Sequence, residues 1–143
     1  MERILISACL VGDNVKYNGG NNLSPKIAKL LEKYELVPFC PEVEGGLPIP
    51  RHPCEQKEDK VFNDIGEDVS EEFLKGADLA YNICLYLKIK KAILKERSPS
   101  CGVHQIYDGT FSHTIINGMG VTAKYLKEKG IEVYNEEEID SLL

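Results

Sequence analysis

Short apolar segments alternate with helix-forming segments along this chain, and this alternation is the feature that most constrains its fold. Four segments have the length and the β-branched or apolar content of buried strands: Ile4 to Ala8, Glu35 to Cys40, Lys91 to Lys95 and Ile131 to Tyr134. Strands that alternate with helices are typical of a mostly parallel sheet covered by helices. We therefore expect residues 1–143 to form one α/β domain with a Rossmann-like, three-layer arrangement.

Three helices are predicted between these strands. The first opens at Ser24-Pro25, with Ser24 as the N-cap and Pro25 in the first helical position. The second is capped by Ser70 and carries apolar residues at helical spacing as far as Leu87; Cys84 belongs to this stripe and is assigned to the core. The third runs from 120 to 129 and ends at a glycine.

The connecting segments are also informative. Residues 41–53 carry four of the seven prolines, which argues against a regular helix or a central strand and favours a rigid, extended loop. Residues 54–68 are polar and are expected to form a flap or a small hairpin. Asp108-Gly109 predicts a second hairpin turn.

Composition limits the classes of partner. Seventeen basic residues stand against 23 acidic ones, for a formal net charge of −6, which disfavours binding to the phosphates of a nucleic acid. No apolar run approaches the roughly 18 residues that a membrane-spanning helix needs, and the start of the chain lacks the pattern of a signal peptide. We therefore expect a cytoplasmic protein.

The five cysteines separate into two groups. In a reducing compartment an odd number of widely spaced cysteines argues against disulfides. Cys9, Cys40 and Cys101 each lie at or just after the end of a predicted strand. The carboxyl ends of parallel strands meet at one edge of the sheet, so these three thiols are expected to converge. Cys54 is predicted to lie in a loop and Cys84 in a helix, outside that group.

Three converging thiolates suit a soft metal. A zinc ion would need a fourth ligand, whereas a four-iron cluster would keep one iron without a protein thiolate, free to act as a Lewis acid. The alternative, which the spacing leaves equally open, is that these cysteines are buried in the core as ordinary apolar side chains.

Several polar residues accompany these cysteines. Glu42 follows Cys40 by two residues and is a candidate acid or base, and Ser98 and Ser100 precede Cys101. Lys16 and Tyr17 are expected at the surface; the alternative is that they approach an anionic or aromatic ligand. The three isolated histidines are not assigned as ligands.

Seven sequence blocks, in this order, resemble a bacterial family whose characterised members are thiouracil desulfurases, and the resemblance spans nearly the whole chain. The blocks are SACLVG (7–12), KYNGG (16–20), CPEVEGGLPIPR (40–51), GEDVSEEFLKGA (66–77), LKERSPSCG (94–102), IYDGTFS (106–112) and GVTAKYL (120–126).

The resemblance implies a [4Fe-4S] cluster held by Cys9, Cys40 and Cys101, with the fourth iron free. It implies non-redox chemistry, in which water attacks the ring carbon of a thiolated pyrimidine and sulfur leaves as hydrogen sulfide. Glu42 is then our choice for proton transfer and Ser100 for orienting the substrate, with Ser98 in reserve.

One departure from the family pattern is visible. Many relatives carry Cys and Arg where this chain has Val15 and Lys16. That cysteine is not one of the three ligands. The segment from Arg51 to Gly66 is also short, which bears on the rim of the pocket.

Two other functions remain open at this point. The strand-end pocket suits a module that binds a nucleotide-like small molecule without chemistry, and the thiols suit a zinc or redox protein. Iron and sulfide content and release of sulfide from a thiopyrimidine separate the three hypotheses.

Overall fold

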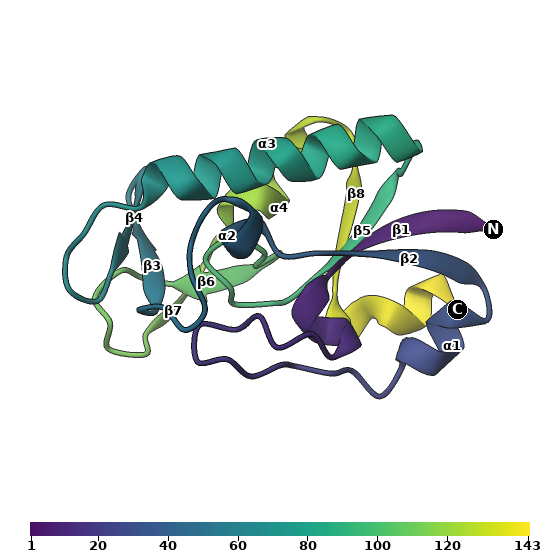
Figure 1. Cartoon of the computed structure of the whole chain (residues 1–143), viewed down its shortest axis with the longest axis horizontal. Coiled ribbons are helices and arrows are strands. Elements are labelled where there is room, and N and C mark those ends of the chain that lie inside the picture. The colour runs from purple at the N-terminus through teal and green to yellow at the C-terminus, as the bar shows by residue number, and fades with distance from the viewer.

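The computed structural model describes all residues from 1 to 143, and a four-stranded parallel sheet forms its centre (Figure 1). The strand order is β2-β1-β5-β8, and every neighbouring pair runs parallel. The strands span Glu2–Ser7 (β1), Tyr34–Phe39 (β2), Lys91–Leu94 (β5) and Glu132–Asn135 (β8). The predicted parallel sheet is thus confirmed.

Helices cover both faces of this sheet. The long helix α3 (Ser70–Leu87) and α4 (Val121–Glu128) pack on one face, while α1 (Ile27–Leu31) and the 3-10 helices η1 (Ala8–Val11) and η2 (Glu136–Leu142) pack on the other. Strand side chains alternate between the two cores, so Leu5 faces α3 and Ile4 faces α1. The predicted three-layer α/β fold is therefore confirmed. No helix has both the length and the apolar content needed to cross a bilayer.

The helix starts differ from those predicted. Ser24 does not cap α1: its Oγ accepts from the N–H of Lys26 at 3.3 Å, within a turn, and the helix begins only at Ile27. Ser70 is the first residue of α3 rather than its N-cap, since its Oγ accepts from the N–H of Val61 at 2.8 Å. Small polar side chains stabilise turns as readily as helix ends, so the sequence alone does not separate a turn from an N-cap at Ser24 or Ser70.

The proline-rich segment also departs from the prediction, because Pro41–Glu44 form the one-turn helix α2. Pro41 occupies the first position, where a helix needs no N–H donor, so proline starts this helix instead of preventing it.

Two antiparallel hairpins lie beyond the carboxyl edge of the sheet (Figure 1). The first pairs β3 (Cys54–Lys57) with β4 (Lys60–Asn63), and the second pairs β6 (Gln105–Tyr107) with β7 (Ile115–Asn117). The first confirms the predicted small hairpin. The second has a seven-residue connection, 108–114, rather than a tight Asp-Gly turn.

Candidate active site

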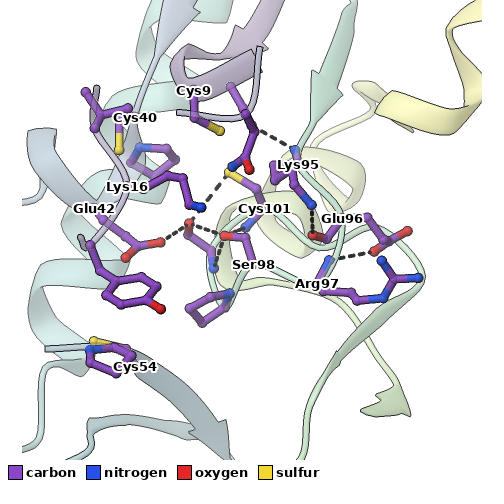
Figure 2. A pocket seen from close by; sticks show the side chains of 18 of the residues that line it. Cys9, Lys16, Cys40, Glu42, Cys54, Lys95, Glu96, Arg97, Ser98 and Cys101 are labelled. Atoms are coloured by element: carbon purple, nitrogen blue, oxygen red, sulfur yellow. Dashed lines mark hydrogen bonds between the residues drawn. The ribbon is translucent and has the colours of Figure 1, made fainter. Parts of the chain in front are cut away.

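Three cysteines from distant parts of the chain line one cavity at the carboxyl edge of the sheet. Cys9 lies in η1 directly after β1, Cys40 follows β2, and Cys101 lies in the loop after β5. All three line a cavity of about 380 Å³, and Figure 2 shows their sulfur atoms around the same space. The structure thus brings together the three thiols that the strand ends predicted. Their role as ligands stays a prediction.

Backbone hydrogen bonds hold Cys9 and Cys40 at the strand ends. Gly12, at a φ of 99°, reverses the chain after η1, and its N–H donates to the carbonyls of Ala8 and Cys9. The N–H of Asn22 also donates to the Cys9 carbonyl, at 2.9 Å. Cys40 is the N-cap residue of α2, and its carbonyl accepts from the N–H of Glu44 at 3.0 Å. A glycine turn and a short helix therefore position these two thiols.

A serine turn positions Cys101. The Ser98 Oγ accepts from the N–H of Ser100 at 3.2 Å and of Cys101 at 3.1 Å. Gly120 packs so closely behind this turn that a Cβ at that position would lie 2.4 Å from the Ser100 carbonyl carbon. The turn is therefore fixed from within by Ser98 and from behind by a residue that must be glycine.

Burial keeps the three thiols protonated in the protein alone. It raises the pKa of Cys9 and of Cys40, and it raises the pKa of Cys101 to about 12. Charge on either of the other two cysteines raises the Cys101 pKa further, so the three sulfurs act on one another electrostatically. A bound metal would be needed to hold them as thiolates near neutral pH.

A carboxylate and a hydroxyl face one another in the same cavity. The Ser100 Oγ donates to Glu42 Oε2 at 2.8 Å and lies 3.6 Å from the sulfur of Cys101. Arg51 Nε donates to the other oxygen of Glu42 at 3.2 Å. The side chains of Arg51 and Glu42 are only 6% and 13% exposed, so this ion pair is largely shielded from water. The arrangement orients a carboxylate for proton transfer next to the thiols.

Two basic residues reach the cavity from opposite sides. Lys95 Nζ lies 2.9 Å from Glu136 Oε2 and donates to the Glu96 carbonyl at 2.9 Å. Lys16 and Tyr17 also line the cavity; Tyr17 is exposed, as predicted, whereas Lys16 is half-buried. Figure 2 shows the Lys16 side chain extending into the space between Glu42 and Cys101, and no carboxylate lies within 4.0 Å of its ammonium group. The loop that carries Lys16 folds back over the sheet edge, which its polar sequence did not reveal.

Cys54 was predicted to lie in a loop, apart from the strand ends; it does lie apart from them, but the loop prediction is wrong. It begins β3 and lines the cavity on the side opposite the strand ends. Burial raises its pKa to about 12, with a further increase from the charge of Glu42. Cys84 lies in the core beneath α3, as predicted.

His113 lines the cavity with the cysteines, whereas the other two histidines lie outside it and contact carboxylates. His52 Nδ1 lies 2.9 Å from Asp64, and His104 Nε2 lies 3.1 Å from Glu138. No three His, Cys, Asp or Glu side chains lie close enough together to bind one metal ion. The structure therefore forms no ready-made site for a single zinc ion.

Comparison with known proteins assigns the chain to a family. The model of the 2-thiouracil desulfurase family matches residues 4–138. The chain belongs to the 2-thiouracil desulfurase family. The resemblance found in the sequence blocks is confirmed.

Two relatives of this desulfurase family are similar to the chain over almost its whole length. An uncharacterised protein of Bacillus subtilis (strain 168), YbbK, is 41% identical over 98% of this chain and 99% of its own. A solved structure of a [4Fe-4S]-dependent thiouracil desulfidase, TudS, is 42% identical and superimposes with a TM-score of 0.94 over 99% of this chain and 95% of its own.

Proposed function

We propose that this protein is an enzyme that removes sulfur from thiouracil or a related thiolated pyrimidine and that residues 1–143 carry the whole site. One observation supports the proposal above all. Three thiols and the Glu42–Ser100 pair meet in one cavity, in a chain 42% identical to a [4Fe-4S]-dependent desulfidase. The cavity, at about 380 Å³, has the size of a small-molecule site rather than of a macromolecular interface.

The donor set fits an iron–sulfur cluster by number and chemistry. Cys9, Cys40 and Cys101 supply three sulfur ligands and no nitrogen, and cysteine thiolate is the usual ligand of such clusters. Each thiolate of a four-iron cluster binds a different iron, so ligand sulfurs lie farther apart than around a single ion. We infer that these three cysteines would hold a [4Fe-4S] cluster.

Such a cluster, when bound, supplies an iron without a protein thiolate, which serves as a Lewis acid for the sulfur of the substrate. The reaction we propose is hydrolytic and non-redox: the thiocarbonyl and water give the carbonyl and hydrogen sulfide. Glu42 takes one proton of the attacking water and gives it to the sulfur; as the carbonyl forms, Glu42 passes the second proton from the added hydroxyl to the departing sulfur, which leaves as hydrogen sulfide. Arg51 keeps Glu42 pointed into the cavity, since it pairs with the oxygen that Ser100 does not contact.

Ser100 orients the substrate. Its hydroxyl lies between Glu42 and Cys101, at 2.8 Å and 3.6 Å, so a pyrimidine bound beside Cys101 comes within reach of this hydroxyl. Ser98 lies behind, with its Oγ 3.0 Å from that of Ser100, and its main task is to shape the turn.

An assay under strict anaerobiosis tests this proposal. The protein, reconstituted with iron and sulfide, should convert 2-thiouracil to uracil and release one sulfide for each uracil formed, with no added reductant. Stabilisation by 2-thiouracil without turnover would favour a binding module. Turnover by the zinc-loaded protein, or turnover that needs a reductant, would favour a zinc or redox protein. Any of these three results contradicts the proposal.

A further inference from the structure

Glu96 is a buried carboxylate that lines the cavity without a hydrogen bond to any of the three thiols, and it lies at the base of the loop that carries one of them. It is 3% exposed and directly precedes residues 97–102, which we call the Cys101 loop. A charged group at such depth requires strong compensation, because desolvation penalises the ionised form.

Backbone amides from both ends of the Cys101 loop supply that compensation. Glu96 Oε1 accepts from the N–H of Arg97 at 3.2 Å, before the loop's turn. It also accepts from the N–H groups of Val103, His104 and Gln105, after the loop, at 2.8, 3.0 and 3.1 Å. One oxygen therefore joins the two ends of the loop.

The other carboxylate oxygen fastens the loop to the sheet. Glu96 Oε2 accepts from Asn135 Nδ2 at 2.7 Å, and Asn135 is the last residue of β8. The backbone N–H of Glu96 donates to Glu136 Oε1 at 2.8 Å. Burial alone would raise the pKa of Glu96, but the hydrogen bonds from Asn135 and from the amides of His104, Gln105 and Arg97 outweigh it and lower this pKa from 4.5 to about 2.

The loop needs this support because its own conformation is strained. Arg97 has a φ of 66°, in the left-handed region that residues with a Cβ avoid. Such a conformation persists only when its surroundings fix it. We propose that Glu96 is the positioning residue that holds the Cys101 loop closed and keeps the Cys101 thiol in place for the cluster, through backbone amides.

The consequence for the cluster rests on the proposed function, but the effect on the loop does not. A direct test therefore uses the protein without iron. In Glu96→Gln the amide N–H₂ must face N–H donors, so the loop should open. Alkylation by iodoacetamide, followed by peptide mass spectrometry, measures the exposure of each cysteine separately. We expect Cys101 to react on the order of tenfold faster than in the wild type, since one lost charged hydrogen bond is worth about that factor.

Two controls separate loop opening from general unfolding. Cys84 is 1% exposed in the core beneath α3, so its rate reports on the global fold within the same molecule and should not change. Glu55→Gln is the matched variant. Glu55, in β3, also accepts hydrogen bonds from two backbone amides, those of Gly109 at 3.0 Å and Phe111 at 3.1 Å, but the loop that these amides belong to (108–114) carries no thiol. This variant should leave the rate of Cys101 unchanged.

The proposal is overturned if Cys101 in Glu96→Gln reacts at the wild-type rate, if Cys84 accelerates equally, or if Glu55→Gln accelerates Cys101 as much. If Glu96→Gln does not fold, hydrogen exchange of the wild type decides: slow exchange at residues 103–105 supports the proposal, and exchange at the rate of free amides contradicts it.

After reconstitution Glu96→Gln should also hold less iron. A wild type that takes up no iron would defeat the proposed function while leaving the alkylation result to stand.

Discussion

The two walls of the cavity are built in different ways. The inner wall consists of the strand ends, with Cys9, Cys40 and the Cys101 loop, and it is continuous with both cores of the sheet. The outer wall consists of the loop around Lys16 and the two hairpins, and it contains Cys54. Polar side chains join the walls: Gln56 Nε2 donates to the carbonyls of Pro99 and Met119, each at 2.9 Å.

This difference suggests that the two walls have different functions. Elements packed on a sheet hold side chains more precisely than hairpins that depend on their own few strands. We therefore expect the inner wall to hold the cluster and the reacting groups, and the outer wall to affect how substrate binds.

Removing a thiol from each wall should give the largest contrast. Cys101→Ala removes a proposed ligand in the inner wall and should abolish the brown colour and the bound iron. Cys54→Ala removes an outer thiol and should retain both. Visible absorption and chemical iron analysis measure the result. Cys84→Ala controls for the loss of a buried thiol. If Cys54→Ala loses its colour as completely as Cys101→Ala, the two walls do not differ in function as proposed.

Changing the carboxylate of the inner wall should affect the chemistry but not the cluster. Glu42→Gln keeps the hydrogen bond from Ser100 but can no longer accept a proton, so kcat should fall by about a hundredfold or more. Iron content should match the wild type. A variant that loses activity only in proportion to lost iron would show that Glu42 serves structure instead.

Acid should weaken the inner wall through Glu96. Its folded pKa of about 2 lies below the ordinary 4.5, so it stabilises the folded state above pH 4.5 and loses this effect as pH falls toward 2. The difference in unfolding free energy between the wild type and Glu96→Gln, both without iron, should be constant above about pH 5 and shrink below it. Urea unfolding at several pH values measures this; a difference independent of pH would exclude the carboxylate as its source.

The smallest effect is expected at the outer wall. Lys16→Met removes an ammonium group that extends into the cavity without a carboxylate partner, and it should raise KM severalfold, up to about tenfold, with little change in kcat. Steady-state kinetics with 2-thiouracil separates the two constants, and Lys16→Arg should restore most of the affinity. A large loss of kcat with unchanged KM would instead place Lys16 among the reacting groups.

The sequence predicted the inner wall better than the outer one, for a physical reason. The strands of a parallel sheet are apolar and regular, so their ends could be located, and the thiols that follow them share one edge. The start of α1 and the helix α2 were missed because Ser24 and Pro41 suit both turns and helix ends.

The outer wall depends on contacts between segments far apart in the chain. Nothing local to Cys54 or Lys16 shows that their segments fold back over the sheet edge, so neither was singled out as part of the cavity wall. Arg51 was visible within a sequence block but not as the partner of Glu42, because that pairing requires the turns between residues 44 and 51.

The iron and acid-labile sulfide content of the wild-type protein, purified without oxygen, tests the central claim most directly. Cys9, Cys40 and Cys101 surround one cavity, so we predict a brown protein with about four irons and four sulfides per chain, as the name of the cluster requires. A colourless protein after anaerobic reconstitution, or one that holds zinc in place of iron, would contradict the account.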